Sequence, residues 1–121
     1  MSKTIMIVDD SFTLRQVVSM TLKKAGFDVL EAEDGVDALK KLDGQKISLF
    51  IFDVNMPNMD GISLLKELNA NKEYAYIPKV MLTTESEQGK IEEGRTSGAK
   101  AWIVKPFKQD TLLAAVKKLV R

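Results

Sequence analysis

The sequence predicts an α/β fold in which a parallel sheet of five strands is covered on both faces by five helices. Short, continuously apolar runs alternate along the chain with longer segments whose apolar residues recur at helical spacing. A strand with one face in water would alternate apolar and polar residues, whereas these runs are apolar throughout. They therefore predict strands buried on both faces and joined by right-handed helical crossovers.

Five apolar runs are predicted to form the strands. They lie at residues 5–8, 27–30, 49–52, 80–82 and 101–104. Glycine and proline mark two of the boundaries, because Gly26 precedes the second run and Pro78 precedes the fourth. The first run is far too short to be a signal segment or a membrane span, and it leads directly into two aspartates.

The first three helices are predicted from apolar stripes and capping residues. The first, at 12–25, has its stripe on Leu14, Val17, Val18, Leu22 and Ala25. Gly26 follows in the position of a left-handed cap, and Asp34 is placed to cap the second helix. The apolar residues of that short helix are Val36, Ala38, Leu39 and Leu42. The third helix is expected at 62–70.

The last two helices differ in how strongly they are specified. The segment 88–97 has Ile91 as its one large apolar residue, and its Gly94 costs about 1 kcal/mol relative to alanine in a helix. We therefore expect a weakly held helix that ends at Gly98. The closing helix has a full apolar stripe, formed by Leu112, Leu113, Val116, Leu119 and Val120.

Length and composition exclude several functions. The chain has 121 residues, and we expect residues 1–121 to form a single domain without an output domain. Its 18 Lys and Arg and 17 Asp and Glu give a net charge of +1, which predicts no nucleic-acid or membrane partner. It has no Cys and no His, which excludes disulfides, Ser-His-Asp triads and metals bound through sulfur or imidazole. We expect a cytoplasmic monomer.

Polar residues directly follow four of the predicted strands. They are Asp9 and Asp10 after the first, Asp53 after the third, Thr83 and Thr84 after the fourth, and Lys105 after the fifth. In open parallel sheets, ligands bind at the carboxyl ends of the strands. These side chains are therefore expected at one edge of the sheet, where they would form a site.

The chemistry of these residue types indicates a phosphoryl-transfer site. Two ionised carboxylates about 4 Å apart repel each other by about 4 kcal/mol at an effective dielectric constant of 20, so the three aspartates should bind a cation. Without His or Cys, an oxygen-only site suits Mg²⁺ together with a phosphate. Lys105 and the hydroxyl of Thr83 can both bind phosphoryl oxygens.

Asp53 is the expected nucleophile. A carboxylate can form an aspartyl phosphate when a metal neutralises the incoming charge. Asp53 stands alone at the end of its strand, so it can face a substrate while Asp9 and Asp10 hold the metal. Asn55, two residues later, could supply its backbone carbonyl as a further ligand of the Mg²⁺.

Four strings, IMIVDD, IFDVNMPNMDG, VMLTTE and WIVKPF, occur in this order along the chain. Their order and spacing resemble the response-regulator receiver family over essentially the whole sequence, most closely its stand-alone chemotaxis members. The resemblance implies a flavodoxin-like sheet with strand order 2-1-3-4-5. It also implies that a phosphohistidine on a sensor histidine kinase donates the phosphoryl group to Asp53, with Mg²⁺ held by Asp9, Asp10, Asp53 and Asn55.

The resemblance also implies a conformational switch. Thr83 would move toward the phosphate, and an aromatic residue, here Trp102, would turn inward. The altered face would comprise the helix 88–97, the strand 101–104 and the closing helix. The peptide bond between Lys105 and Pro106 is expected to be cis. Trp102 stands where the family usually has Tyr or Phe, and Thr84 stands where many relatives have Ala, which would narrow the groove beside Thr83.

Two positions are expected to set the lifetime of the phosphoryl group. Asn55 and Glu85 lie two residues beyond the phosphoacceptor and the switch threonine, and this pair resembles the short-lived chemotaxis type. A lifetime of seconds to minutes is expected. The protein would then be a phosphoacceptor with self-catalysed phosphorylation and dephosphorylation rather than an enzyme.

The expected partners are a chemotaxis sensor kinase, the flagellar motor switch and a phosphatase. A phosphorelay intermediate, which passes its phosphoryl group to another histidine protein, is an alternative within the family. A phosphatase of the haloacid-dehalogenase type is less favoured, because Asp53-Val54-Asn55 lacks the second aspartate of that motif. A flavodoxin-like nucleotide-binding module is disfavoured because Asp9 and Asp10 would repel a phosphate dianion.

Overall fold

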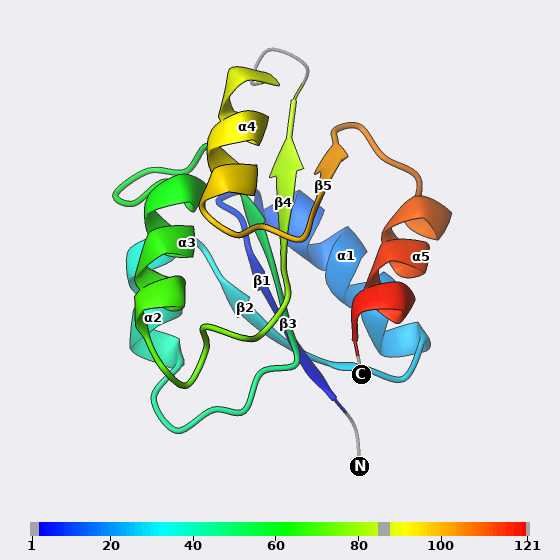
Figure 1. The fold of residues 1–121 in the computed structure, drawn as a ribbon. Coiled ribbons are helices and arrows are strands. Elements are labelled where there is room, and N and C mark those ends of the chain that lie inside the picture. The colour runs from blue at the N-terminus through cyan, green and yellow to red at the C-terminus, as the bar shows by residue number, and fades with distance from the viewer. Residues whose placement is uncertain (1–2, 85–87, 121) are drawn as a thin grey trace.

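The computed structural model of the protein describes residues 3–84 and 88–120, and it contains a single sheet with helices on both sides (Figure 1). In chain order, the elements are β1 (Thr4–Val8), α1 (Phe12–Lys24), β2 (Asp28–Ala32), α2 (Gly35–Lys41), β3 (Leu49–Asp53), α3 (Gly61–Ala70), β4 (Lys79–Thr83), α4 (Gln88–Thr96), β5 (Ala101–Val104) and α5 (Gln109–Leu119). No helix within these described ranges is long and apolar enough to cross a membrane.

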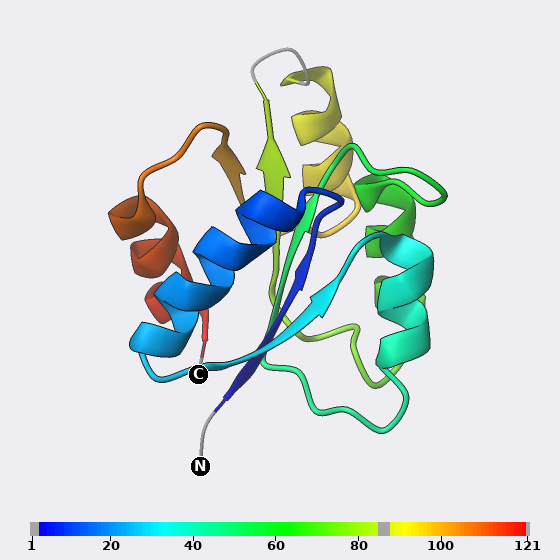
Figure 2. The same ribbon diagram turned by 180° about the vertical axis from the view of Figure 1, so that it is seen from behind.

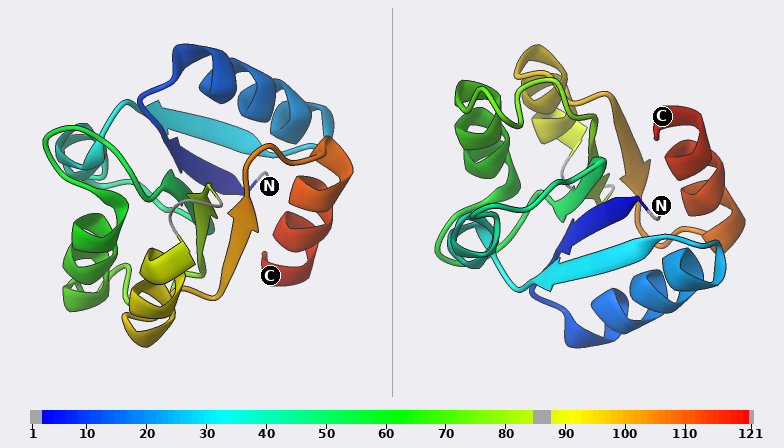
Figure 3. Two further views of the ribbon diagram at one scale, coloured as in Figure 1. Left: turned by 90° about the horizontal axis from the view of Figure 1, so that it is seen from above. Right: turned by 90° about the horizontal axis from the view of Figure 1, so that it is seen from below.

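The strands are all parallel and lie in the order β2-β1-β3-β4-β5. Helices α1 and α5 cover one face, and α2, α3 and α4 cover the other (Figures 2 and 3). Successive strand residues point to opposite faces. In β1, Ile5 and Ile7 therefore join the core beneath α1 and α5, while Met6 and Val8 join the core beneath α2 and α3. The predicted fold class and strand order are confirmed.

The second strand begins one residue later than predicted and ends two residues later, at Ala32 rather than Leu30. Phe27 lies in the turn that closes α1 rather than in the strand, because its N–H donates to the carbonyl of Leu22 after the left-handed Gly26, whose φ is 95°. The strand then pairs with β1 as far as the Val8–Ala32 position. The extension was not predicted because Glu31 interrupts the apolar run. A polar residue is tolerated there because β2 is an edge strand, where polar side chains can reach solvent.

The predicted apolar stripe of α1 was partly wrong. Val17 is 42% exposed and Ala25 is exposed, whereas Ser19 and Thr21 are buried with Val18 and Leu22. Thr21 tolerates burial because its hydroxyl donates to a carbonyl of the preceding helical turn, at 2.9 Å.

Two further packing details differ from the sequence-based expectation. Val36, assigned to the apolar face of α2, is exposed. In α4, Gly94 is buried, and a Cβ at this position would lie 2.7 Å from Sδ of Met81. The glycine therefore allows α4 to approach β4 closely, which explains why a poor helix former occupies the middle of this helix.

Lys79, at the start of β4, is a buried lysine that the sequence analysis did not single out. Only 1% of the residue is exposed, and its ammonium donates to the carbonyls of Tyr74 at 2.6 Å and Ala75 at 3.2 Å. Burial, together with the charge of Lys100, lowers the pKa of Lys79 to about 8. The ammonium thus ties the turn between α3 and β4 to the sheet.

Tyr74 connects the same turn to the loop between α2 and β3. Its hydroxyl donates to the carbonyl of Leu42 at 2.8 Å and to that of Gln45 at 3.1 Å. Its ring meets Phe50 edge-on, with the centroids 5.8 Å apart. These contacts fix the end of the sheet that lies opposite the predicted site.

The pH dependence of unfolding should reveal the buried lysine. Because the pKa of Lys79 is about 8 in the folded protein and near 10.5 in the unfolded chain, the unfolded chain binds more protons between these values. The free energy of unfolding should therefore gain about 2 kcal/mol from this group between about pH 7.5 and 9.5. Urea titrations of wild type and Lys79→Met should diverge by this amount across the window.

The matched control is Lys118→Met, which removes an exposed ammonium. Its stability should follow the wild-type pH curve. Burial raises the pKa of Tyr74, so this hydroxyl does not titrate in the same window. Parallel curves for wild type and Lys79→Met would contradict the assignment.

Candidate functional site

Three carboxylates meet at the carboxyl edge of the sheet. Asp9 directly follows β1 and is fully buried, Asp10 is exposed, and Asp53 is the last residue of β3, with 6% of its surface exposed. Each contributes a carboxylate oxygen, and these oxygens lie within 4.8 Å of one another. The structure therefore brings together the three aspartates that the sequence assigned to one edge.

Lys105 lies among these carboxylates. Its ammonium donates to Oδ2 of Asp53 at 3.0 Å and to Oδ2 of Asp9 at 3.1 Å. Burial disfavours the ammonium, but its hydrogen bond to Asp53 and the charges of both aspartates outweigh burial and raise the pKa of Lys105 above its ordinary value. The peptide bond that joins Lys105 to Pro106 is cis.

Asp53 is held in an environment that disfavours its charge. Burial raises the pKa of the Asp53 carboxyl above its ordinary value, even though Lys105 acts in the opposite direction. With three carboxylates against one ammonium, the cluster has an excess of negative charge when ionised. A divalent cation bound by oxygen ligands would offset this excess, and the cluster could hold one.

Thr83 ends β4 beside this cluster. Its hydroxyl is buried and has no hydrogen-bond partner within the described part of the chain. A buried hydroxyl without a partner costs about 1–3 kcal/mol, so a ligand oxygen that accepts its hydrogen bond would be favoured. Thr84 is half-buried and lines a cavity of about 590 Å³ with Lys105 and Phe107.

The loop that follows Asp53 is fixed by its own hydrogen bonds. Asn55 is exposed, and its N–H donates to Oδ1 of Asp53 at 3.3 Å. Asn58 adopts a φ of 66°, and its amide donates to Asp34 at 2.8 Å. Asp34 also caps α2 by accepting from the N–H of Asp37, as predicted, and these hydrogen bonds lower the pKa of Asp34.

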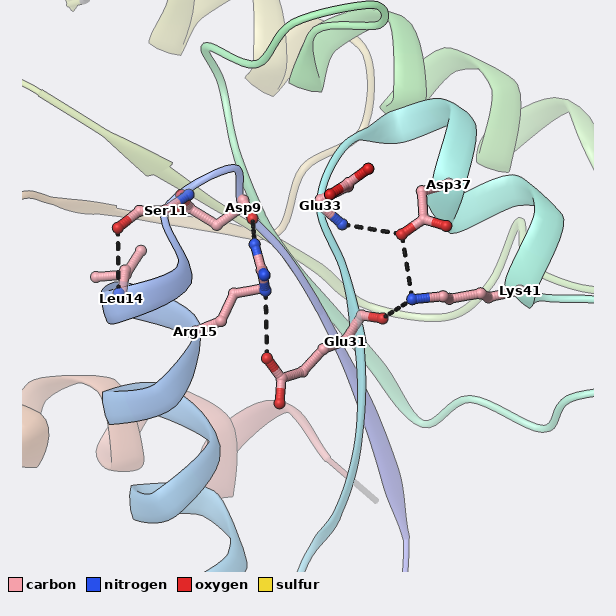
Figure 4. Close-up of polar contacts among 8 residues, drawn as sticks. All are labelled: Asp9, Ser11, Leu14, Arg15, Glu31, Glu33, Asp37 and Lys41. Carbon is pink, nitrogen blue, oxygen red and sulfur yellow. Dashed lines mark hydrogen bonds and ion pairs between the residues drawn. The ribbon is translucent and has the colours of Figure 1, made fainter.

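Arg15 is a residue of this region that the sequence analysis missed. Its guanidinium donates to the backbone carbonyl of Asp9 and, at 3.2 Å, to the carboxylate of Glu31 (Figure 4). The side chain is only 14% exposed. The sequence did offer a signal for Arg15, since it lies one helical turn after Ser11, the residue that caps α1. This spacing places Arg15 near the turn that carries Asp9.

The turn between β1 and α1 is consequently held at several atoms. Ser11 donates its N–H to Oδ1 of Asp9 at 2.8 Å, and its hydroxyl accepts from the N–H of Leu14 at 3.2 Å. The N–H of Asp9 itself donates to the carbonyl of Ala32 in β2. Asp9 thus has little freedom to leave the cluster.

A second polar chain connects β2 to α2 (Figure 4). Lys41 donates to the backbone carbonyl of Glu31 at 2.8 Å and pairs with Asp37 at 3.1 Å. The same carboxylate of Asp37 accepts the N–H of Glu33. These contacts hold β2 in place, and β2 carries Glu31, the partner of Arg15.

Trp102 lies on the same sheet face as Thr83. It stands opposite Met81, two residues before Thr83 on the neighbouring strand, so the alternation of side chains places both residues on the α4 face. The indole is half-buried and packs against the core beneath α2, α3 and α4. Glu85, expected to tune the phosphoryl lifetime, lies outside the described residues.

Comparisons with known proteins identify the family. A family model described as the response regulator receiver domain matches residues 5–117. The chain belongs to this family. The receiver is 40% identical over 110 residues to chemotaxis protein CheY1 of Helicobacter pylori strain J99, with 89% of each chain covered. It is 39% identical over 116 residues to CheY-3 of Vibrio cholerae, with 95% of this chain and 89% of that protein covered.

Solved structures agree with the sequence comparisons. The structure of chemotaxis response regulator CheY4 of Vibrio cholerae matches with a TM-score of 0.92 and 40% identity, covering 99% of this receiver and 100% of that chain. The resemblance to the chemotaxis members and the flavodoxin-like sheet are therefore confirmed.

Removing Arg15 should loosen the turn that holds Asp9. Arg15→Gln leaves a buried carbonyl of Asp9 without its charged donor and Glu31 without its partner, so the free energy of unfolding should fall by about 2 kcal/mol. Urea denaturation measures this loss. Arg15→Lys, which retains a cationic donor, should lose less. Equal stability of Arg15→Gln and wild type would show that these hydrogen bonds do not hold the turn.

Proposed function

We propose that this receiver is a two-component response regulator that accepts a phosphoryl group on Asp53 with the help of Mg²⁺. The observation that carries the proposal is the cluster at the sheet edge, in which three carboxylates converge around one ammonium. The negative excess fits a bound cation, and the buried hydroxyl of Thr83, which has no hydrogen-bond partner among the described residues, fits a phosphoryl oxygen. The chemotaxis relatives at about 40% identity support the same function.

Asp9, Asp10, Asp53 and the backbone carbonyl of Asn55 would hold the Mg²⁺. Mg²⁺ bound at these residues supplies positive charge that offsets the repulsion between the carboxylates and the incoming phosphoryl group. The site offers oxygen ligands that suit this cation, since the described residues around it include carboxylates and carbonyls, and the chain has no Cys or His.

In the proposed reaction, a carboxylate oxygen of Asp53 attacks the phosphorus of a phosphohistidine on the donor kinase. A P–O bond to Asp53 forms as the P–N bond to the imidazole breaks, and the electron pair of that bond leaves with the ring nitrogen, which takes a proton from solvent. Lys105, already hydrogen-bonded to Asp53, would bind a phosphoryl oxygen. The hydroxyl of Thr83 would donate to another.

The phosphoryl group would then change the surface formed by α4, β5 and α5. Thr83 and Trp102 share a sheet face, so a displacement of the threonine toward the phosphate frees space beside the indole. An inward turn of Trp102 would report the phosphorylated state on this surface. The Thr84 side chain lines a cavity with Leu14 and Phe107 on the α1 and α5 side of the sheet, so it does not bear on the room for this turn on the α4 side.

For the biological context, we propose a cytoplasmic, monomeric chemotaxis regulator. The relatives named as chemotaxis proteins favour a chemotaxis sensor histidine kinase as phosphoryl donor, the flagellar motor switch as output target and a dedicated phosphatase as a further partner. A single-domain phosphorelay intermediate is the alternative role for the same site. In either role the protein is a self-catalysing phosphoacceptor and does not turn over substrates as an enzyme.

Labelling by acetyl phosphate tests the acceptor directly. Wild type with Mg²⁺ should incorporate radiolabelled phosphate, and Asp53→Ala should lose this incorporation because the nucleophilic oxygen is gone. Asp43→Ala, which removes an exposed carboxylate far from the cluster, should label as wild type does. Retained labelling of Asp53→Ala would place the acceptor elsewhere.

The lifetime of the phosphoryl group should be seconds to minutes. The pair of Asn55 and Glu85, which resembles the short-lived chemotaxis type, supports this expectation. Radiolabelled protein freed of acetyl phosphate should therefore lose its label on this timescale in Mg²⁺ buffer. Chelation of Mg²⁺ should slow the loss, because the phosphoryl group would then be less electrophilic. A label that persists for hours in Mg²⁺ buffer would contradict the expected lifetime.

A further inference from the structure

We propose that Arg95 is a positioning residue that holds the Trp102 indole against α4. It would thereby bias the surface formed by α4, β5 and α5 toward the state of the unphosphorylated protein. The inference rests on the proposed switching role of Trp102 and deepens it, because it assigns a residue that sets the balance between the two states. The observation is a cation–π contact, in which the Arg95 guanidinium carbon lies 5.0 Å from the centroid of the indole ring.

The guanidinium is available for this contact. Arg95 has one ion-pair partner among the described residues, Glu92, at 3.9 Å and one helical turn away on an exposed surface. Such pairs contribute little because water screens them. Tryptophan is the aromatic residue that attracts a cation most strongly, so the indole is the stronger partner.

Arg95 lies where α4 meets the strands. Its neighbour Gly94 packs directly on Met81, and Met81 stands opposite Trp102 in the sheet. A rotation of the indole would therefore disturb its stacking with Arg95. It would also disturb the neighbouring contact between Gly94 of α4 and Met81 of β4. The orientation of Trp102 and the position of α4 are coupled through these adjacent contacts.

Other contacts hold α4 to α3 rather than to β5. Lys66 pairs with Glu93 at 3.6 Å between exposed side chains, and the amide of Asn69 donates to the carbonyl of Ser97 just after the helix. Neither contact involves Trp102. The cation–π contact is thus the polar link that couples α4 to the proposed switch residue within the described residues.

The expected size of the effect follows from the strength of such contacts. A cation–π interaction at a partly exposed site corresponds to about a two- to fivefold change in an equilibrium constant. If the inward turn of Trp102 breaks the contact, loss of Arg95 should shift the switch equilibrium toward the turned state by this factor. A shift of this size would change the fraction of protein in the turned state, but phosphorylation would still be needed to populate that state fully.

The first test measures the resting protein, without phosphorylation. Trp102 is the single tryptophan, so indole fluorescence reports on it alone. In Arg95→Gln the indole should show lower anisotropy and faster quenching by acrylamide, a neutral quencher whose access does not depend on charge. Arg95→Lys should restore part of the wild-type signal, and Lys100→Gln, a nearby exposed control, should match wild type. Identical anisotropy and quenching in Arg95→Gln and wild type would overturn the proposal.

The second test measures the switch. The acetyl phosphate concentration that gives half of the Trp102 emission change, in Mg²⁺ buffer, should fall by about two- to fivefold in Arg95→Gln. An unchanged or higher midpoint would overturn the assigned bias. If no variant, wild type included, responds to acetyl phosphate, the proposed phosphoryl switch itself fails. A difference between the resting proteins would then still show that Arg95 positions the indole.

Discussion

The structure depends on the placement of negative charge at one edge of an otherwise apolar sheet. Asp9 and Asp53 are buried beside each other, and Lys105 reaches both of them. An isolated buried carboxylate would be strongly destabilising, and one shared ammonium offsets only part of the cost of several. The remaining imbalance is the physical basis of the proposal that this edge binds a cation and, with its help, a phosphoryl group.

The two apolar cores, one on each face of the sheet, position the residues at this edge. Because both faces of the sheet are packed, the ends of β1 and β3, which carry Asp9 and Asp53, are held in position relative to each other. The surrounding turns add specific restraints, such as the hydrogen bond from Arg15 to Asp9 and that from Asn58 to Asp34. Groups held in this way need little reorganisation when charge arrives.

The sequence predicted where the aspartates lie better than it predicted the contacts that support them. Residues such as Asp9 and Asp53 could be assigned to one edge because the carboxyl ends of parallel strands must meet there. The strand order came from family resemblance, since apolar runs do not specify their neighbours. The burial of Lys79 could not be predicted, because it depends on which turn packs over the strand and supplies its carbonyl acceptors.

Calorimetric titration with Mg²⁺ tests whether the converging carboxylates bind a divalent cation. Wild type should bind one Mg²⁺ per chain, and Asp10→Asn should bind it much more weakly. Because Asp10 is exposed, this substitution should leave the fold intact, which circular dichroism can check. Absence of Mg²⁺ binding by wild type, or undiminished binding by a folded Asp10→Asn variant, would contradict the account.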